Sequence, residues 1–399
     1  MIEVDVAPRR TKIAAAADEP ARYLVLGDFG GRVAEPLAVD RDNLSDVMSI
    51  LHVSAGGMRL RELEDFHPDR LYERFEMASA TGQSASEPEP EPSADSPKAD
   101  IGELLRPISL LEQIAGGGDP FDKYVKDLAR AHAVPRKKRS DRNAALGERL
   151  NAMLHHPRFQ ALESAWRGLD LAVRQMDDVA ARILVVQFSK DDLAADLASD
   201  NLRGTRLYTL LHSRRWAAAI GLHSFNETEI ELLARVALVA GDARVPYLAE
   251  GSTGIASALG ELREIPEAAW LGLALPRLLL RLPYGSRTSP IDSFEFEEMS
   301  AAPSHEQYLW GNAAVACLAV LVRAEPENLN LDGLPSHTYK QDSEWVMKPC
   351  GEFLMTETQV LALIDAGLMP IVSYKDRPLV RVAGFRAVNS APLRLPAPF

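Results

Sequence analysis

The chain has 399 residues, of which 46% are hydrophobic and 25% are charged, as in an ordinary soluble globular protein of two or three domains. Its formal net charge of −13 argues against general nucleic-acid binding. The two cysteines, Cys317 and Cys350, provide neither a disulfide framework nor a CxxC metal site.

The same features predict where the protein resides. The opening residues, MIEVDVAPRR, lack the apolar core of a signal peptide. The longest apolar stretch, residues 270–282, is interrupted by a proline and two arginines and is too short to span a bilayer. We therefore expect a cytoplasmic protein in a reducing compartment, without direct membrane insertion.

The N-terminal part begins with residues 1–20, which we expect to be a flexible lead. Residues 23–26 form an apolar run that predicts a buried strand, and the glycine-rich turn 27–32 follows it. The spacing of these glycines fits no phosphate-binding loop. Further on, Asp65, His67 and Asp69 fall within LEDFHPD, for which we favour a turn or helix cap over a metal site.

The composition changes abruptly at residues 79–100, which read SATGQSASEPEPEPSADSPKAD. This stretch has too little apolar surface to offset the entropy of ordering it, so we predict a disordered, extended linker. The predicted organisation is therefore a lead (1–20), a small N-terminal module (21–78), a linker (79–100) and an α/β region (101–399).

The start of the α/β region is less informative. Residues 104–114 are an apolar-periodic segment, and residues 121–133 predict a helix. A basic cluster follows at residues 136–139. It is interpreted either as a solvated loop or helix start, or as a contact with an acidic neighbouring subunit.

A strong amphipathic helix is predicted from Pro157, which suits a first helical turn. Its apolar stripe follows steps of 3, 4, 3 and 4 residues, and Glu163 and Arg167 are expected on the other faces. Gly168 inside the pattern indicates close packing of another backbone. The stripe consists of Phe159, Leu162, Trp166, Leu169 and Val173.

Strands then alternate with helices, which is typical of an α/β fold. We predict strands at residues 182–188, 216–222, 245–249, 345–350, 369–374 and 379–382. Helices are expected after the N-cap Ser189, at residues 227–239 behind Asn226, and at 356–367 behind a capping box. The fold class is therefore α/β (α+β), with mixed sheets and flanking helices.

Arg277 and Arg281 stand four residues apart in a leucine-rich segment and share a face whether it is helical or extended. Carboxylates follow at Glu295, Glu297 and Glu298, so we expect a buried or interfacial arginine–carboxylate network. A catalytic role for Glu297 and Glu298 is less favoured, since no partnered histidine or metal cluster accompanies them.

Four segments occur in the order HHPRFQALESAWRGLDLAV, GLALPRLLLRLPYG, FEFEE and LWGNAA. Together they resemble the large subunit of the type VI secretion contractile sheath (TssC, or VipB, type). The N-terminal segments YLVLGDFGGR and LEDFHPD resemble the small sheath subunit (TssB, or VipA, type). The resemblance implies a sheath-subunit core joined to a small-subunit-like module.

This resemblance implies a structural subunit that polymerises around an inner tube and contracts to drive effector delivery. The implied partners are other sheath subunits, an Hcp-like inner tube protein, baseplate components and a ClpV-type AAA+ unfoldase, without nucleic acid. No catalytic residue, cofactor or metal is expected. Candidate structural or interface residues are Trp166, Arg167, Arg277, Arg281, Glu297, Glu298, Trp310, Asp28 and Asp65.

Two other functions stay open. One is a non-polymerising adaptor of a sheath end or baseplate in the same system. The other, less favoured, is an α/β enzyme with an unrecognised site that uses Asp65 and His67, or Glu297 and Glu298.

Overall fold

The computed structural model describes residues 19–32, 35–55, 57–81, 139–299, 303–375 and 377–395. Residues 1–18 of the expected lead and 82–100 of the expected linker lie outside these ranges. The predicted segments at 104–114 and 121–133 also lie outside them, as does most of the basic cluster at 136–139.

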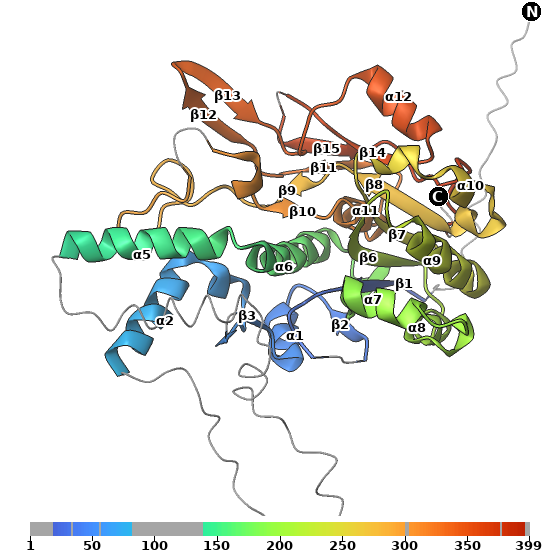
Figure 1. Ribbon diagram of the computed structural model, residues 1–399, viewed down its shortest axis with the longest axis horizontal. Helices are drawn as coiled ribbons and strands as arrows, with labels where there is room; N and C mark the ends of the chain where they lie inside the picture. The colour runs from blue at the N-terminus through green and yellow to red at the C-terminus, as the bar shows by residue number, and fades with distance from the viewer. Residues whose placement is uncertain are drawn as a thin grey trace, which may run out of the picture.

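A nine-stranded mixed sheet forms the centre of the molecule, with strand order β11-β15-β14-β8-β7-β6-β1-β5-β2 (Figure 1). Six neighbouring strands, from β14 to β5 in this order, are parallel, and the strands beyond them are antiparallel. The strands of this sheet are β1 (Ala21–Gly27), β2 (Leu37–Val39), β5 (Ala181–Gln187), β6 (Ala218–Phe225), β7 (Tyr247–Gly251), β8 (Leu271–Leu275), β11 (Asn330–Asp332), β14 (Met369–Ser373) and β15 (Leu379–Val382).

Three two-stranded ladders lie outside the main sheet. They pair β3 (Ser54–Ala55) with β4 (Met58–Arg59), β9 (Leu278–Leu279) with β10 (Trp310–Gly311), and β12 (His337–Gln341) with β13 (Glu344–Lys348). The β12–β13 hairpin projects from the body at the upper left of Figure 1.

Helices cover both faces of the main sheet because its strands bury side chains on both sides. In β1, Tyr23 and Val25 pack into one core with α1, α2, α5, α6 and α11. Leu24 and Leu26 point to the other face, which α7, α8, α9 and α10 cover. The helices are α1 (Leu44–Leu51), α2 (Pro68–Thr81), α5 (Arg139–Leu154), α6 (Pro157–Gln175), α7 (Lys190–Leu197), α8 (Arg206–His212), α9 (Ile230–Ala243), α10 (Gly260–Glu264), α11 (Ala314–Leu321) and α12 (Glu357–Asp365).

Five 3₁₀ turns complete the described secondary structure. They are η1 (Leu63–Phe66), η3 (Leu202–Gly204), η4 (Ile255–Ser257), η5 (Pro266–Trp270) and η6 (His305–Gln307). Among the described residues, none of the helices combines the length and apolar character needed to cross a membrane.

The predicted α/β class with a mixed sheet and flanking helices is confirmed. The predicted N-cap Ser189 and the predicted capping box of Thr356 are confirmed, and Ser189 forms a capping box as well, with Asp192. The helix expected at 227–239 begins three residues later, at Ile230. The reason is local: the Thr228 amide donates to the Asn226 side chain, so a turn precedes the helix.

The N-terminal segment contributes to the same sheet as the rest of the chain. Strand β1 lies between β5 and β6 and is parallel to both. Aromatic pairs join residues 29–72 to the later part of the chain: Phe29 packs against Trp166, Phe66 against Phe159, and Tyr72 against Phe294. Residues 21–78 therefore share one hydrophobic core with the region after residue 139.

Candidate functional site

A buried charge network joins helix α6 to the loop after β9. The Arg281 side chain is 9% exposed and lies between Glu163 and Glu298, whose side chains are 0% exposed. Its Nε is 2.8 Å from Glu163 Oε1, and its terminal nitrogens lie 2.7 and 2.9 Å from the two oxygens of Glu298. One guanidinium is thus shared by two fully buried carboxylates.

Further groups complete the hydrogen bonding of these carboxylates. Arg167 donates to Glu163 over 2.7 Å and to the Tyr284 hydroxyl over 3.1 Å. The Tyr284 backbone amide donates to Glu298 over 2.7 Å. Burial alone would raise the pKa of Glu298, but the Arg281 charge and the donated hydrogen bonds outweigh it and hold that pKa at about 2.

The network changes two expectations for helix α6. Glu163 lies outside the predicted apolar stripe, yet it is fully buried, because it faces the Arg281 segment. Gly168 was expected to admit another backbone. A Cβ on Gly168 would instead lie 2.9 Å from the Val315 side chain, so the glycine admits helix α11.

Trp166 belongs to the core of the molecule. Its side chain is 0% exposed, and its indole Nε1 donates to the Phe29 carbonyl over 3.1 Å. Because Phe29 follows strand β1, this contact fixes the N-terminal segment against helix α6.

Arg277 does not join the Arg281 network. It forms a bidentate pair with Glu352, with distances of 3.1 and 2.5 Å. His305 Nε2 lies 2.8 Å from the same carboxylate, and His305 Nδ1 lies 2.9 Å from Lys348 Nζ. Since the ammonium can only donate, His305 accepts at Nδ1 and donates from Nε2 to Glu352.

Two further candidates from the sequence have local roles. Trp310 is 7% exposed, stacks on His305 and donates from Nε1 to the His305 carbonyl over 2.9 Å. Glu297 is exposed and accepts from the Ser286 amide and hydroxyl, at 3.0 and 2.6 Å. The predicted arginine–carboxylate network therefore includes Arg281 and Glu298, while Arg277 and Glu297 lie outside it.

The candidates near the N-terminus contact both their own turns and more distant segments. Asp28 accepts from the Gly30 amide at 3.0 Å and from the Gln187 side chain at 2.9 Å. Asp65 is buried and pairs with Arg74, whereas His67 packs against Tyr284. Within the described ranges, no group of three potential metal-binding side chains is found.

Some residues of these clusters escaped the sequence analysis. Glu163 carried a signal, because it lies four residues after Phe159 and three before Trp166, at the edge of the apolar stripe. No sequence pattern indicated the cluster of Glu352, His305 and Lys348, because only the fold brings their segments together. Chemically, these clusters neutralise buried charge and join chain segments that are far apart in sequence.

Comparison with known proteins identifies the family. The chain matches the family model described as VipB: EvpB/VC_A0108, tail sheath N-terminal domain, over residues 140–258 and 256–391. These ranges make up more than half of the chain, which therefore belongs to this family.

A curated relative agrees with the family. The chain is 25% identical over 299 residues to the type VI secretion system sheath protein TssC1 of Pseudomonas aeruginosa (strain PAO1). The alignment covers 62% of this chain and 60% of the relative, which is less than two thirds of the relative's length. The resemblance to the large sheath subunit is thus confirmed, while the small-subunit resemblance of residues 21–78 lies outside the matched family ranges.

Proposed function

We propose that this protein is a structural subunit of a type VI secretion contractile sheath. The family match over residues 140–391 carries the proposal. Copies would form rings around an inner tube of the Hcp type, and shortening of the stacked rings would drive the tube and its effectors outward. A subunit of this kind requires no catalytic residue.

The paired charges support a structural role over an enzymatic one. Glu298 is bound by Arg281 and by the Tyr284 amide, and Asp65 is bound by Arg74. The pKa of Glu298 is held at about 2, so this carboxylate stabilises the fold in its ionised form, which opposes a role as general acid at neutral pH.

We also propose that residues 21–78 serve as the small sheath subunit in the same chain. The place of β1 between β5 and β6 supports this proposal, because the N-terminal segment completes the sheet instead of forming a core of its own. The short edge strands β2 and β11 offer backbone groups to which neighbouring subunits can add strands.

Negative-stain microscopy of the chain alone, and together with the products of neighbouring genes, tests the assembly. We expect hollow tubes or cogwheel-ended cylinders in at least one of the two samples. Uniform small particles in both samples would contradict polymerisation and favour the sheath-end or baseplate adaptor. Baseplate components and a ClpV-type unfoldase are the further partners to be tested by co-purification.

A further inference from the structure

The β12–β13 hairpin presents an unpartnered face with an aromatic side chain. Its register sets Lys340 opposite Trp345 and Thr338 opposite Met347, so these four side chains lie on one face. The Trp345 side chain is 73% exposed. Lys340 is also exposed, and among the described residues its ammonium group has no hydrogen-bond or ion-pair partner.

The base of the hairpin is firmly held, although its tip is free. His337, the first residue of β12, is hydrogen-bonded through Nδ1 to the Tyr308 hydroxyl over 2.8 Å. Lys348, the last residue of β13 and the partner of His337 in register, bonds to His305 and lies over the rings of Tyr308 and Trp310. The hairpin is thus an arm that presents Trp345 in a defined position, at little entropic cost on binding.

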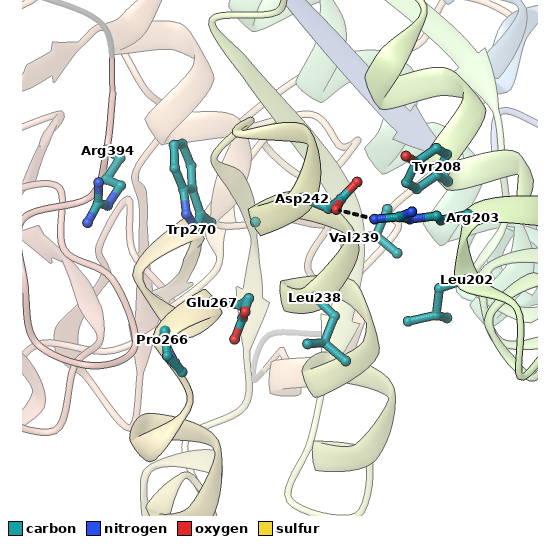
Figure 2. A pocket seen from close by; sticks show the side chains of 11 residues that line it. Leu202, Arg203, Tyr208, Leu238, Val239, Asp242, Pro266, Glu267, Trp270 and Arg394 are labelled. Atoms are coloured by element: carbon teal, nitrogen blue, oxygen red, sulfur yellow. Dashed lines mark hydrogen bonds and ion pairs between the residues drawn. The ribbon is translucent and has the colours of Figure 1, made fainter.

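A groove of suitable chemistry lies on the helical layer formed by η3, α9 and η5. It encloses about 480 Å³ and has Trp270 and the 40% exposed Leu238 in its lining. Figure 2 shows Trp270 and Arg394 at one end and the Asp242–Arg203 pair at the other. Glu267 lies between these ends, and its carboxylate has no hydrogen-bond or ion-pair partner in the described part of the chain.

The arm and the groove lie at opposite ends of the parallel strands. The groove residue Trp270 directly precedes Leu271, the first residue of β8. The hairpin emerges beyond the other end of β8, where the Leu279 amide bonds to the Cys350 carbonyl. Figure 1 likewise shows the β12–β13 hairpin and helix α9 on different sides of the molecule. An arm therefore cannot enter its own groove, whereas it can enter that of a second copy.

We propose that the β12–β13 arm of one copy docks into the α9–η5 groove of the next copy, head to tail. Trp345 fills the apolar part of the groove, and Lys340 pairs with Glu267 at its rim. An exposed aromatic anchor with a charged pair beside it is the usual composition of a binding hot spot. The two surfaces differ, so the contact repeats from copy to copy and generates a ring or a helix.

This inference rests on the proposed function, and disulfide cross-linking of the full chain tests it. Cys317 and Cys350 are buried, so an introduced exposed cysteine is the reactive thiol. Chains with Lys340→Cys are mixed with differently tagged chains carrying Glu267→Cys under mild oxidation. We expect a mixed disulfide dimer, and a much lower yield when Val179→Cys, at a residue 85% exposed, replaces Glu267→Cys.

Two sets of variants then examine the contact itself. Trp345→Ala should lower the cross-link yield by about tenfold or more, without affecting the fold, because the side chain is exposed. In sedimentation, Lys340→Glu and Glu267→Lys should each weaken association, and a mixture of the two chains should restore it.

The outcomes separate this contact from the sheath function. A yield no higher than that of the Val179→Cys control would overturn the contact, and tubes seen by microscopy in the unsubstituted protein would then leave the sheath function standing. Absence of both cross-links and assemblies would overturn both.

Discussion

At Arg281, three charges meet in a largely buried part of the molecule. Replacing Arg281 with Met would leave Glu163 and Glu298 buried without their shared cation. Because an uncompensated buried charge is costly, we expect the free energy of unfolding to fall by about 3–5 kcal/mol, measured by urea denaturation.

Arg174→Met on the same helix is the matched control. Arg174 pairs with Asp170 over a similar distance of 2.7 Å, but its side chain is 66% exposed. Water screens this pair, so Arg174→Met should lower the free energy of unfolding by less than about 1 kcal/mol. Equal losses in the two variants would show that burial of the Arg281 network adds nothing to stability.

His223 should make the fold sensitive to mild acid. Its Nε2 lies 2.8 Å from the Phe188 carbonyl, to which it must donate, so Nδ1 accepts from the Tyr247 hydroxyl at 3.0 Å. Burial lowers the pKa of His223 from 6.5 to about 4. The unfolded chain therefore binds the proton more tightly, and stability present above pH 6.5 is lost as the pH falls toward 4.

The size of this loss follows from the shift. A pKa lowered from 6.5 to about 4 corresponds to roughly 3 kcal/mol of the free energy of unfolding. Chemical denaturation at a series of pH values measures it, and His223→Gln should reduce the slope between pH 6.5 and 4. His52→Asn, on an exposed histidine, is the control and should keep the slope. An unchanged slope in His223→Gln would refute the assignment of this proton to His223.

Among the elements, the packing of α6 against α11 depends on Gly168. In the native chain, a methyl group at this position would meet Val315, so Gly168→Ala should destabilise the fold despite the better helix propensity of alanine. In a Val315→Ala background the space is available, and the same substitution should stabilise by up to about 1 kcal/mol. A double-mutant cycle monitored by denaturation measures this reversal of sign.

Gly147 in α5 provides the corresponding control. A Cβ there would make ordinary contacts of 3.6 Å with Phe294 and Phe296. Gly147→Ala should therefore stabilise the native chain outright. If Gly168→Ala were equally stabilising without the Val315 change, the close approach of the two helices would be disproved.

The elements also show which structural information is local in the sequence. The strand 379–382 and the capping box of Thr356 could be predicted because the alternation of apolar residues and the N-cap chemistry act over a few residues. The α6 stripe identified Trp166 as buried for the same reason.

The remaining features depend on partners that are distant in sequence. The burial of Glu163 depends on Arg281, and the position of β1 depends on β5 and β6. Of the two strands of the β12–β13 arm, the sequence predicts only the second, at residues 345–350. The first, β12, has the polar sequence HTYKQ, which gives no apolar strand pattern. Such a strand is specified by its pairing and by the anchors at its base rather than by its own hydrophobicity.

At the scale of the whole molecule, the order of the strands makes the N-terminal segment inseparable from the rest. Leu24, Val25 and Leu26 are 0% exposed, and β1 forms registered ladders with two strands. Exposing this apolar surface would be costly, so the covalent connection through residues 82–138 should not be needed to hold the folded parts together.

Site-specific cleavage tests this expectation. A protease recognition sequence inserted between Pro92 and Ser93 would cut the chain within the predicted linker. We expect the two fragments to coelute from a sizing column and to unfold in one transition, at a midpoint that falls with dilution because the association is no longer intramolecular.

Leu24→Asp in the same cleavable chain supplies the contrast. A charge buried in the core under α7, α8 and α9 should release the N-terminal fragment after cleavage, while the uncut variant stays joined through its linker. If the fragments of the unsubstituted chain separated after cleavage, residues 21–78 would be an independent module. Coelution would mean that pairing of β1 with β5 and β6, rather than the linker, holds the two segments together. The same sheath core could then be built from one chain or from two.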